Sequence, residues 1–170
     1  MYYTIPLAIG LFANLIAGQY VRKRAEERLA HPFTPLPDLL HDCFPNIPVF
    51  APDYFLLACV VVVVYYRSSL VEFEKNALAI GLCTIVRAFS VCFTTMPTCM
   101  PKNVGTYTHD LMFSGHTLFF IGIGNMLDSS IIPVVGPFLL VVARQHYTVD
   151  VCVSGLVYFA MYANLDKLRS

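Results

Sequence analysis

The sequence predicts an all-α integral membrane protein, and three observations support this fold class. Of its 170 residues, 57% are hydrophobic and only 13% are charged, whereas soluble domains carry about 25% charged residues. The mean hydropathy is +0.65. The segment from Tyr54 to Tyr66 contains an unbroken run of valines, Val60 to Val64, and has no polar face to turn toward water. Lipid is therefore the better solvent for such segments.

Six apolar segments are expected to become helices of one compact transmembrane bundle. Their strictly apolar cores are short compared with the roughly 17–20 residues that cross a hydrocarbon core, so flanking tyrosines and polar residues must complete the crossings. Because few residues are left between the segments, residues 1–170 are predicted to form a single domain. The segments are about Tyr2 to Tyr20, Tyr54 to Tyr66, Ala77 to Phe93, Leu111 to Leu127, Ile131 to Val142 and Val149 to Ala163.

Two longer segments between these helices are expected to be irregular. Arg22 to Pro52 is polar and rich in proline, and Met96 to Thr108 contains two prolines and a glycine, which interrupt helices. Six crossings bring the loops around Asp38, Thr108 and His146 to one side of the membrane and both termini to the other. Basic residues in the first loop conflict with a non-cytosolic position for that side, so the residues alone leave the orientation open.

Other polar residues of these loops are expected to be structural or solvated. Asp38 is expected to fix the first loop together with Pro35 and Pro37. The three loop histidines expected to meet water are His31, His41 and His109.

Composition and residue spacing argue against several kinds of site. The net charge is zero and no basic cluster is interleaved with aromatic residues, so nucleic-acid binding is not expected. No Cys/His spacing suits zinc and no glycine-rich loop suits a nucleotide, so no metal or other cofactor is expected. Four of the six cysteines lie in apolar segments, where they pack as small hydrophobic residues. Cys43 and Cys99 lie in loops, and whether they pair is left open.

A histidine and an aspartate four residues apart form the first motif suited to chemistry, His146-Tyr147-Thr148-Val149-Asp150. If this segment is helical, the spacing places both side chains on one face. The carboxylate would then hold the proton on one imidazole nitrogen and leave the other nitrogen free, as in an oriented nucleophile or base. The alternative is a polar turn at a membrane surface, where both side chains meet water.

The second motif, Ser114-Gly115-His116-Thr117, supplies a hydroxyl, a glycine that lets a ligand approach the backbone, and a second imidazole. The two intervening helices run out and back, so both motifs are expected on the same membrane face. Two imidazoles, one of them with a carboxylate partner, suit phosphoryl or phosphodiester transfer, in which one attacks phosphorus and the other moves protons.

Four segments in chain order carry a resemblance to a known family. They are Pro35-Leu36-Pro37-Asp38, Arg87 with Thr94 to Pro97, Asp110-x3-Ser114-Gly115-His116-Thr117, and His146-Tyr147-Thr148-Val149-Asp150-Val151. Together they resemble the four motifs of the sphingomyelin synthase family, within the type 2 phosphatidic acid phosphatase-like superfamily of lipid phosphatases and phosphotransferases. Thr34, Thr108 and His109 replace motif residues of the family. Further replacements in the second and fourth motifs leave the head-group preference open.

The resemblance implies an enzyme that transfers phosphocholine or phosphoethanolamine from a glycerophospholipid to the primary hydroxyl of ceramide and releases diacylglycerol. It implies that His146 attacks phosphorus, that Asp150 orients His146, and that His116 acts first as acid and then as base. The implied partners are the phospholipid donor, the ceramide acceptor and the bilayer, and a homo-oligomer is allowed. The implied location is a multi-pass protein of the Golgi, endoplasmic reticulum or plasma membrane, with its active site on the lumenal or exoplasmic side.

Six further residues are expected to bind the phosphate or the head group: Ser114, Gly115, Asp110, Arg87, Arg144 and Tyr147. Hydrogen-bond donors of Ser114, Gly115 and Arg144 would meet non-bridging oxygens. Asp110 would orient a histidine or meet a cationic head group, with Tyr107 and Tyr147 as aromatic faces for that cation. Arg87 is expected either to act in the site or to make a structural bond within the membrane.

Two rival functions use the same sequence features. A phospholipid hydrolase, either a phosphatase or an enzyme like phospholipase C, would use the same histidines and aspartate with water as acceptor. The K-x6-R-P and S-R-x5-H patterns of superfamily phosphatases are absent from the sequence, which favours the transferase. A membrane scaffold or carrier that kept the fold without the chemistry is the second rival.

Overall fold

The computed structural model describes residues 4–28, 35–66, 70–99 and 111–168. Within these ranges the chain forms seven helices and no strand, so the predicted all-α class is confirmed. The helices are α1 (Thr4–Arg28), α2 (Leu39–Cys43), α3 (Ala51–Tyr66), α4 (Leu70–Phe93), α5 (Gly115–Met126), α6 (Ile132–Val142) and α7 (Thr148–Leu168).

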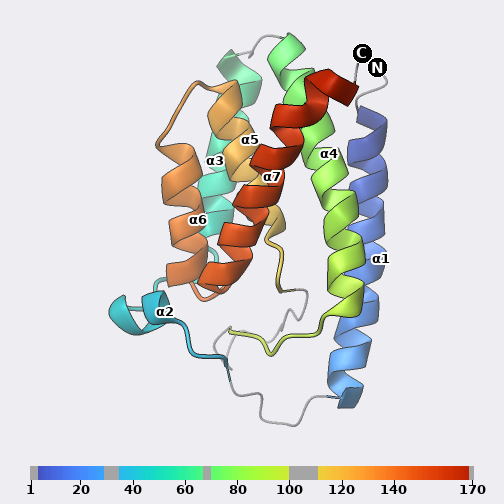
Figure 1. Cartoon of the computed structure of the whole chain (residues 1–170). Coiled ribbons are helices and arrows are strands. Elements are labelled where there is room, and N and C mark those ends of the chain that lie inside the picture. Colours follow the sequence, from blue (N-terminus) through green and yellow to red (C-terminus); the bar gives the residue numbers. More distant parts are fainter. Residues whose placement is uncertain (1–3, 29–34, 67–69, 100–110, 169–170) are drawn as a thin grey trace.

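All helices except the short α2 run alternately up and down along one bundle (Figure 1). The start of α1 and the end of α7 lie at the same end, at the top of Figure 1. The starts of α3, α5 and α7 point toward the opposite end, where α2 lies outside the bundle. We call this opposite end the α2 end. It gathers the segments that hold the predicted motifs.

The main core lies where α4, α5 and α7 meet. Cys83 of α4, Leu118 of α5 and Tyr158 of α7 are completely buried there. A Cβ at Gly122 would lie 2.7 Å from the Ile80 side chain, so α4 and α5 approach each other closely at this glycine. This packing fixes the position of α5 along the bundle, and therefore the position of the second motif at its start.

Helix α1 lies along α4, and two glycines set the distance between them. A Cβ added to Gly10 would lie 2.0 Å from Thr84 Oγ1, and one added to Gly81 would lie 2.5 Å from the backbone nitrogen of Leu7. Only glycine permits this contact, because real side chains never approach so closely. Small residues play this role in many membrane helix pairs.

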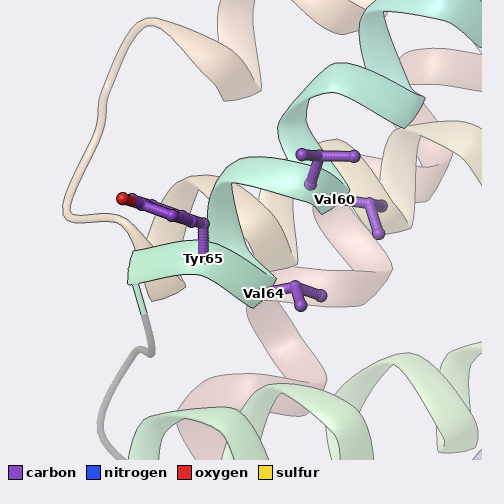
Figure 2. A pocket seen from close by; sticks show the side chains of 4 residues that line it. Val60, Val64 and Tyr65 are labelled. Carbon is purple, nitrogen blue, oxygen red and sulfur yellow. The ribbon is translucent and has the colours of Figure 1, made fainter.

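Within the described ranges, three helices are long and apolar enough to cross a membrane, over Thr4–Ala25, Val71–Phe93 and Thr148–Leu165. Their length and composition indicate a membrane protein. Apolar side chains also cover the outer surface of α3, where Val60, Val64 and Tyr65 line a hollow of about 470 Å³ (Figure 2). The lining consists of three valines and one tyrosine, so the hollow is a feature of an apolar outer surface.

Several predicted boundaries were wrong. Helix α1 continues to Arg28 and α4 starts at Leu70, because the charged residues after Tyr20 and before Ala77 are good helix formers. Residues 111–114 are not helical, and α5 begins only at Gly115 with Ser114 as its N-cap. Ser and Asp residues favour such caps because their side chains accept the first free N–H groups of a helix.

The Gly10 and Gly81 contact predicts the effect of adding one methyl group. Gly81→Ala should lower the free energy of unfolding by about 1–3 kcal/mol, because the new Cβ meets backbone that cannot move aside. Gly18→Ala on the same helix pair is the matched control, since nothing lies within 4 Å of its Cβ position. Thermal unfolding in detergent measures both, if it is monitored by the added reaction with a thiol-reactive dye as the buried cysteines Cys59, Cys83 and Cys99 become accessible. Equal midpoints for the two variants would contradict the close contact.

Candidate active site

The carboxylate of Asp150 organises the turn that precedes α7. Its Oδ2 accepts the backbone N–H of Tyr147 at 2.9 Å and faces His146 Nδ1 at 3.3 Å. Its Oδ1 accepts the backbone N–H of Met112 at 2.7 Å. Asp150 is fully buried and His146 is 7% exposed. A carboxylate at Nδ1 keeps the ring proton on that nitrogen, so the lone pair of Nε2 is left for chemistry.

His146 and Asp150 meet as predicted, but they do not share a helical face. Helix α7 begins at Thr148, so His146 lies in the turn before it. Asp150 occupies the third helical position, from which an acidic side chain reaches back to the N–H that precedes the helix. This capping interaction starts the helix two residues after His146, so the condition that the whole segment is helical is not met, and the two side chains meet through the capped turn instead.

The second imidazole has a carboxylate partner of its own. His116 lies in the first turn of α5, and its Nε2 is 3.1 Å from Asp53 Oδ1 in the first turn of α3. The other carboxylate oxygen of Asp53 accepts the side-chain amide of Gln145 at 2.9 Å. Since Gln145 directly precedes His146, Asp53 links the two histidine segments. The side chains of His116 and Asp53 are 40% and 39% exposed, so this pair is open to solvent.

Asp53 and Gln145 are functional candidates that the sequence analysis missed. Asp53 stands at the start of an apolar segment, and a lone acidic residue in that position is the signal that could have found it. Gln145 gave no such signal, because its role depends on a contact with a residue 92 positions away.

Ser114 and Gly115 build the start of α5. The Ser114 hydroxyl accepts the N–H of Thr117 at 3.2 Å, and the Ser114 N–H donates to Ser154 Oγ at 2.6 Å. The Ser154 hydroxyl donates in turn to the backbone oxygen of Asp150. Ser114 is completely buried, so its hydroxyl caps the helix here, and its predicted contact with phosphate stays a prediction. The backbone N–H groups of Gly115 and His116 belong to a helix N-terminus, which favours anions.

Arg87 is buried in α4 and bonds to the segment that precedes α5. Its Nε donates to the backbone oxygen of Phe113 at 2.7 Å, and a Cβ at Gly115 would lie 3.6 Å from the same nitrogen. One terminal nitrogen donates to the side-chain oxygen of Asn14 on α1. Arg87 therefore makes structural bonds within the bundle, which was one of its two expected roles. A direct contact of Arg87 with substrate stays a prediction.

Helix α2 and its flanks hold the backbone of the His146 turn. His41 is buried, and its Nε2 lies 3.1 Å from the backbone oxygen of His146. The expectation that His41 is solvated was wrong, because the fold brings α2 across this turn. The Arg144 guanidinium donates to the backbone oxygen of His41. Arg144 itself has a positive φ of 60°, which marks the sharp bend between α6 and the turn.

Tyr147 is buried and ties two loops together. Its hydroxyl accepts the N–H of Leu36 at 2.9 Å and donates to the backbone oxygen of Pro97 at 3.0 Å. Burial raises the pKa of this phenol to about 12, although the hydrogen bond from Leu36 acts in the opposite direction. Tyr147 also lines a hollow of about 450 Å³ at the α2 end. The other lining residues are mostly apolar: Leu36, Pro37, Asp38, Leu39, Leu40, Met96, Thr148 and Val149.

Asp38 has the structural role that was predicted. It is the N-cap of α2, and its carboxylate accepts the Thr148 N–H at 2.6 Å and the Thr148 hydroxyl at 2.8 Å. Burial alone would raise the pKa of Asp38, but the two bonds from Thr148, together with the nearby His41, outweigh burial and lower the pKa below its usual 3.8. Asp38 therefore joins the starts of α2 and α7.

Some predicted residues lie outside the described part of the chain: His31, Thr34, Tyr107, Thr108, His109 and Asp110. Cys43 and Cys99 are both free thiols, with Cys43 exposed and Cys99 buried. Among the described residues, no group of three His, Cys, Asp or Glu side chains could hold a metal ion.

Comparison of the chain with models of protein families, with characterised proteins and with solved structures finds no match. The functional argument therefore depends on the geometry of the two histidine–carboxylate pairs and on the motifs in the sequence.

The bonds of Asp38 predict a pH-dependent contribution to stability. Because its pKa is lower in the folded protein than the usual 3.8, its stabilisation is complete above that value and is lost as the pH falls through the folded pKa. Asp38→Asn should therefore cost about 1–2 kcal/mol at pH 7, and the difference from the wild type should shrink toward pH 3. Unfolding midpoints across this range test the prediction. Asp42→Asn, at an exposed neighbour, is the control, and a constant difference for Asp38→Asn would contradict it.

Proposed function

We propose that this chain is a lipid phosphotransferase that moves a phospho-head group from a glycerophospholipid to ceramide and releases diacylglycerol. One observation carries the proposal: two imidazoles each face their own carboxylate, His146 with Asp150 at 3.3 Å and His116 with Asp53 at 3.1 Å. Gln145 links the two pairs. The resemblance of the motifs to the sphingomyelin synthase family supplies the identity of the lipids.

In the first step, the Nε2 lone pair of His146 attacks the phosphorus of the donor lipid. A nitrogen–phosphorus bond forms, the bond between phosphorus and the glycerol oxygen breaks, and protonated His116 gives its proton to that oxygen. Diacylglycerol leaves with this proton. Asp150 supports the positive charge that develops on His146, and Asp53 supports the protonated form of His116.

In the second step, neutral His116 takes the proton of the primary hydroxyl of ceramide. The ceramide oxygen attacks phosphorus, and the nitrogen–phosphorus bond breaks, which returns His146 to its neutral state. His116 is again protonated, so both histidines end the cycle as they began it. The exposure of His116 and Asp53 lets an acceptor approach this pair.

Charge on the non-bridging oxygens would be stabilised by donors at the start of α5. The backbone N–H groups of Gly115 and His116 lie at the N-terminus of α5, a helix of 12 residues. Helix N-termini favour anions. Arg144 is a second proposed donor, because its guanidinium already lies beside the His146 turn through its bond to His41. Positioned donors of this kind commonly supply a large share of catalysis.

We further propose that the six longer helices all lie in the membrane, with the α2 end on the lumenal or exoplasmic side of the Golgi, endoplasmic reticulum or plasma membrane. Helices α5 and α6 have 12 and 11 residues, or about 16–18 Å at 1.5 Å per residue, which is less than a hydrocarbon core of about 30 Å. The site would thus lie below the surface of the membrane, near the phosphates of the lipids. One basic residue that opposes this orientation, Arg24, bonds to the backbone oxygens of Val91 and Cys92 at the end of α4, which gives it a structural reason to be there.

The hollow beside Tyr147 and Thr148 suits a hydrocarbon chain of one lipid substrate. Its lining is mostly apolar, and it adjoins the residues that follow His146 in the chain. A chain held there would keep its head group close to the two imidazoles.

A hydrolase is the second candidate, and one observation favours it. The exposed pair of His116 and Asp53 admits water as readily as a hydroxyl of ceramide. The same two steps would then release the head group as a free phosphate ester.

Purified protein in detergent, supplied with labelled phosphatidylcholine or phosphatidylethanolamine, tests the proposal. We expect a labelled phosphosphingolipid only when ceramide is present, and an equal amount of diacylglycerol beyond the one molecule per enzyme that the first step releases without ceramide. Head-group release without ceramide would support the hydrolase instead, and no turnover of either lipid would contradict both. His146→Ala should lower the rate at least about 1,000-fold, whereas Asp42→Asn, a change at an exposed acid of α2, should leave it unchanged.

The same assay tests the partner of the second imidazole. Asp53→Asn keeps the size of the side chain and an oxygen for Gln145 but removes the charge that supports protonated His116. We expect kcat to fall about 10- to 100-fold with little change in KM and in thermal stability. Wild-type kcat would show that Asp53 has no part in proton transfer.

A further inference from the structure

A chain of hydrogen bonds connects α1 to the start of α5. Arg87 lies within the span Val71–Phe93, is 7% exposed, and donates both to Phe113 and to Asn14. Phe113 directly precedes Ser114, the N-cap of α5. A positive charge inside a membrane is costly unless polar groups surround it. The acceptors that Arg87 finds therefore decide where its guanidinium lies.

Asn14 is held rigidly on the α1 side of this chain. Its side-chain nitrogen donates to the backbone oxygen of Gly10 at 2.7 Å and to that of Thr84 at 2.6 Å. Because both amide hydrogens are used in this way, the side-chain oxygen is left to accept from Arg87. The close contact of Gly10 and Gly81 brings α1 near enough to α4 for these bonds to form.

We propose that Asn14 is a positioning residue that holds Arg87 against the backbone oxygen of Phe113 and thereby fixes the turn carrying Ser114 and His116. The catalytic meaning of this role rests on the proposed function. Helix α1 is then more than a membrane anchor, since it supplies a polar group to a chain of hydrogen bonds that ends at Phe113, three residues before His116. The guanidinium runs beside Gly115, so its displacement would loosen the first turn of α5.

Asn14→Leu tests this role, because leucine is of similar size and has no polar atoms. The readout is hydrogen–deuterium exchange of the intact protein in detergent, measured for a peptide covering residues 111–118. Three amides of this peptide donate to side chains, those of Met112, Ser114 and Thr117. We expect their exchange to become about 10-fold faster in Asn14→Leu, with no change in α7 over residues 153–162. Gln19→Leu is the matched control, an exposed amide on the same helix.

A double-mutant cycle with Arg87→Met separates this role from simple packing. If Asn14 acts through Arg87, then Arg87→Met alone speeds exchange at residues 111–118, and Asn14→Leu adds nothing in that background. Wild-type exchange in Asn14→Leu overturns the inference. It is also overturned if adding Asn14→Leu to Arg87→Met speeds exchange by the same factor as Asn14→Leu does alone.

Lipid transfer supplies a second readout of the same variants. Activity per folded molecule should fall about 10-fold or more in Asn14→Leu, and it should not fall further when this change is added to Arg87→Met. Wild-type activity per folded molecule in Asn14→Leu would overturn the catalytic meaning. If the wild type transfers no lipid, the proposed function fails, whereas the exchange measurements still decide whether Asn14 positions Arg87.

Discussion

The carboxylate of Asp150 accepts hydrogen bonds from the turn just before it and from Met112, which lies 38 residues earlier in the chain. One oxygen holds the backbone of Tyr147 and the ring of His146, and the other holds the backbone of Met112. A buried carboxylate is tolerated only when such partners are present. The turn before α7 and the segment before α5 must therefore arrive together, and the proposed nucleophile is placed by the same bonds that make burial of Asp150 acceptable. Met112, whose N–H donates to this carboxylate, has a positive φ of 88°.

The other polar interactions extend this arrangement outward. Asp53 joins α3 to the second imidazole and to the turn through Gln145, and Asp38 joins α2 to the start of α7. On the far side, Asn14 and Arg87 connect α1 to the segment before Ser114. The site is thus assembled from helix starts and loops at one end of an apolar bundle. The apolar helices fix its overall shape, and a few polar interactions fix the positions of its histidines and carboxylates.

The helical class and the existence of each long helix could be predicted from the sequence, because runs such as Val60 to Val64 report directly on the solvent around them. The meeting of His146 with Asp150 could also be predicted, because four residues of spacing bring the two together in a helix and in a capped turn alike. The starts of the helices were harder to predict. Leu111 to Phe113 are apolar and suit a helix by composition, but hydrogen bonds to Asp150 and from Arg87 hold their backbone in another conformation. The partners of Asp53 and His41 could not be predicted, because His116 lies 63 residues from Asp53 and His146 lies 105 residues from His41 in the sequence.

The central claim is that His146 forms a bond to phosphorus while His116 moves protons. The most direct measurement is mass spectrometry of protein incubated with head-group-labelled donor lipid in the absence of acceptor and quenched at alkaline pH. We expect the phospho-head group on His146 alone, and its disappearance when ceramide is added. A label on His116, or product formation by an enzyme that never carries a label on His146, would contradict the account.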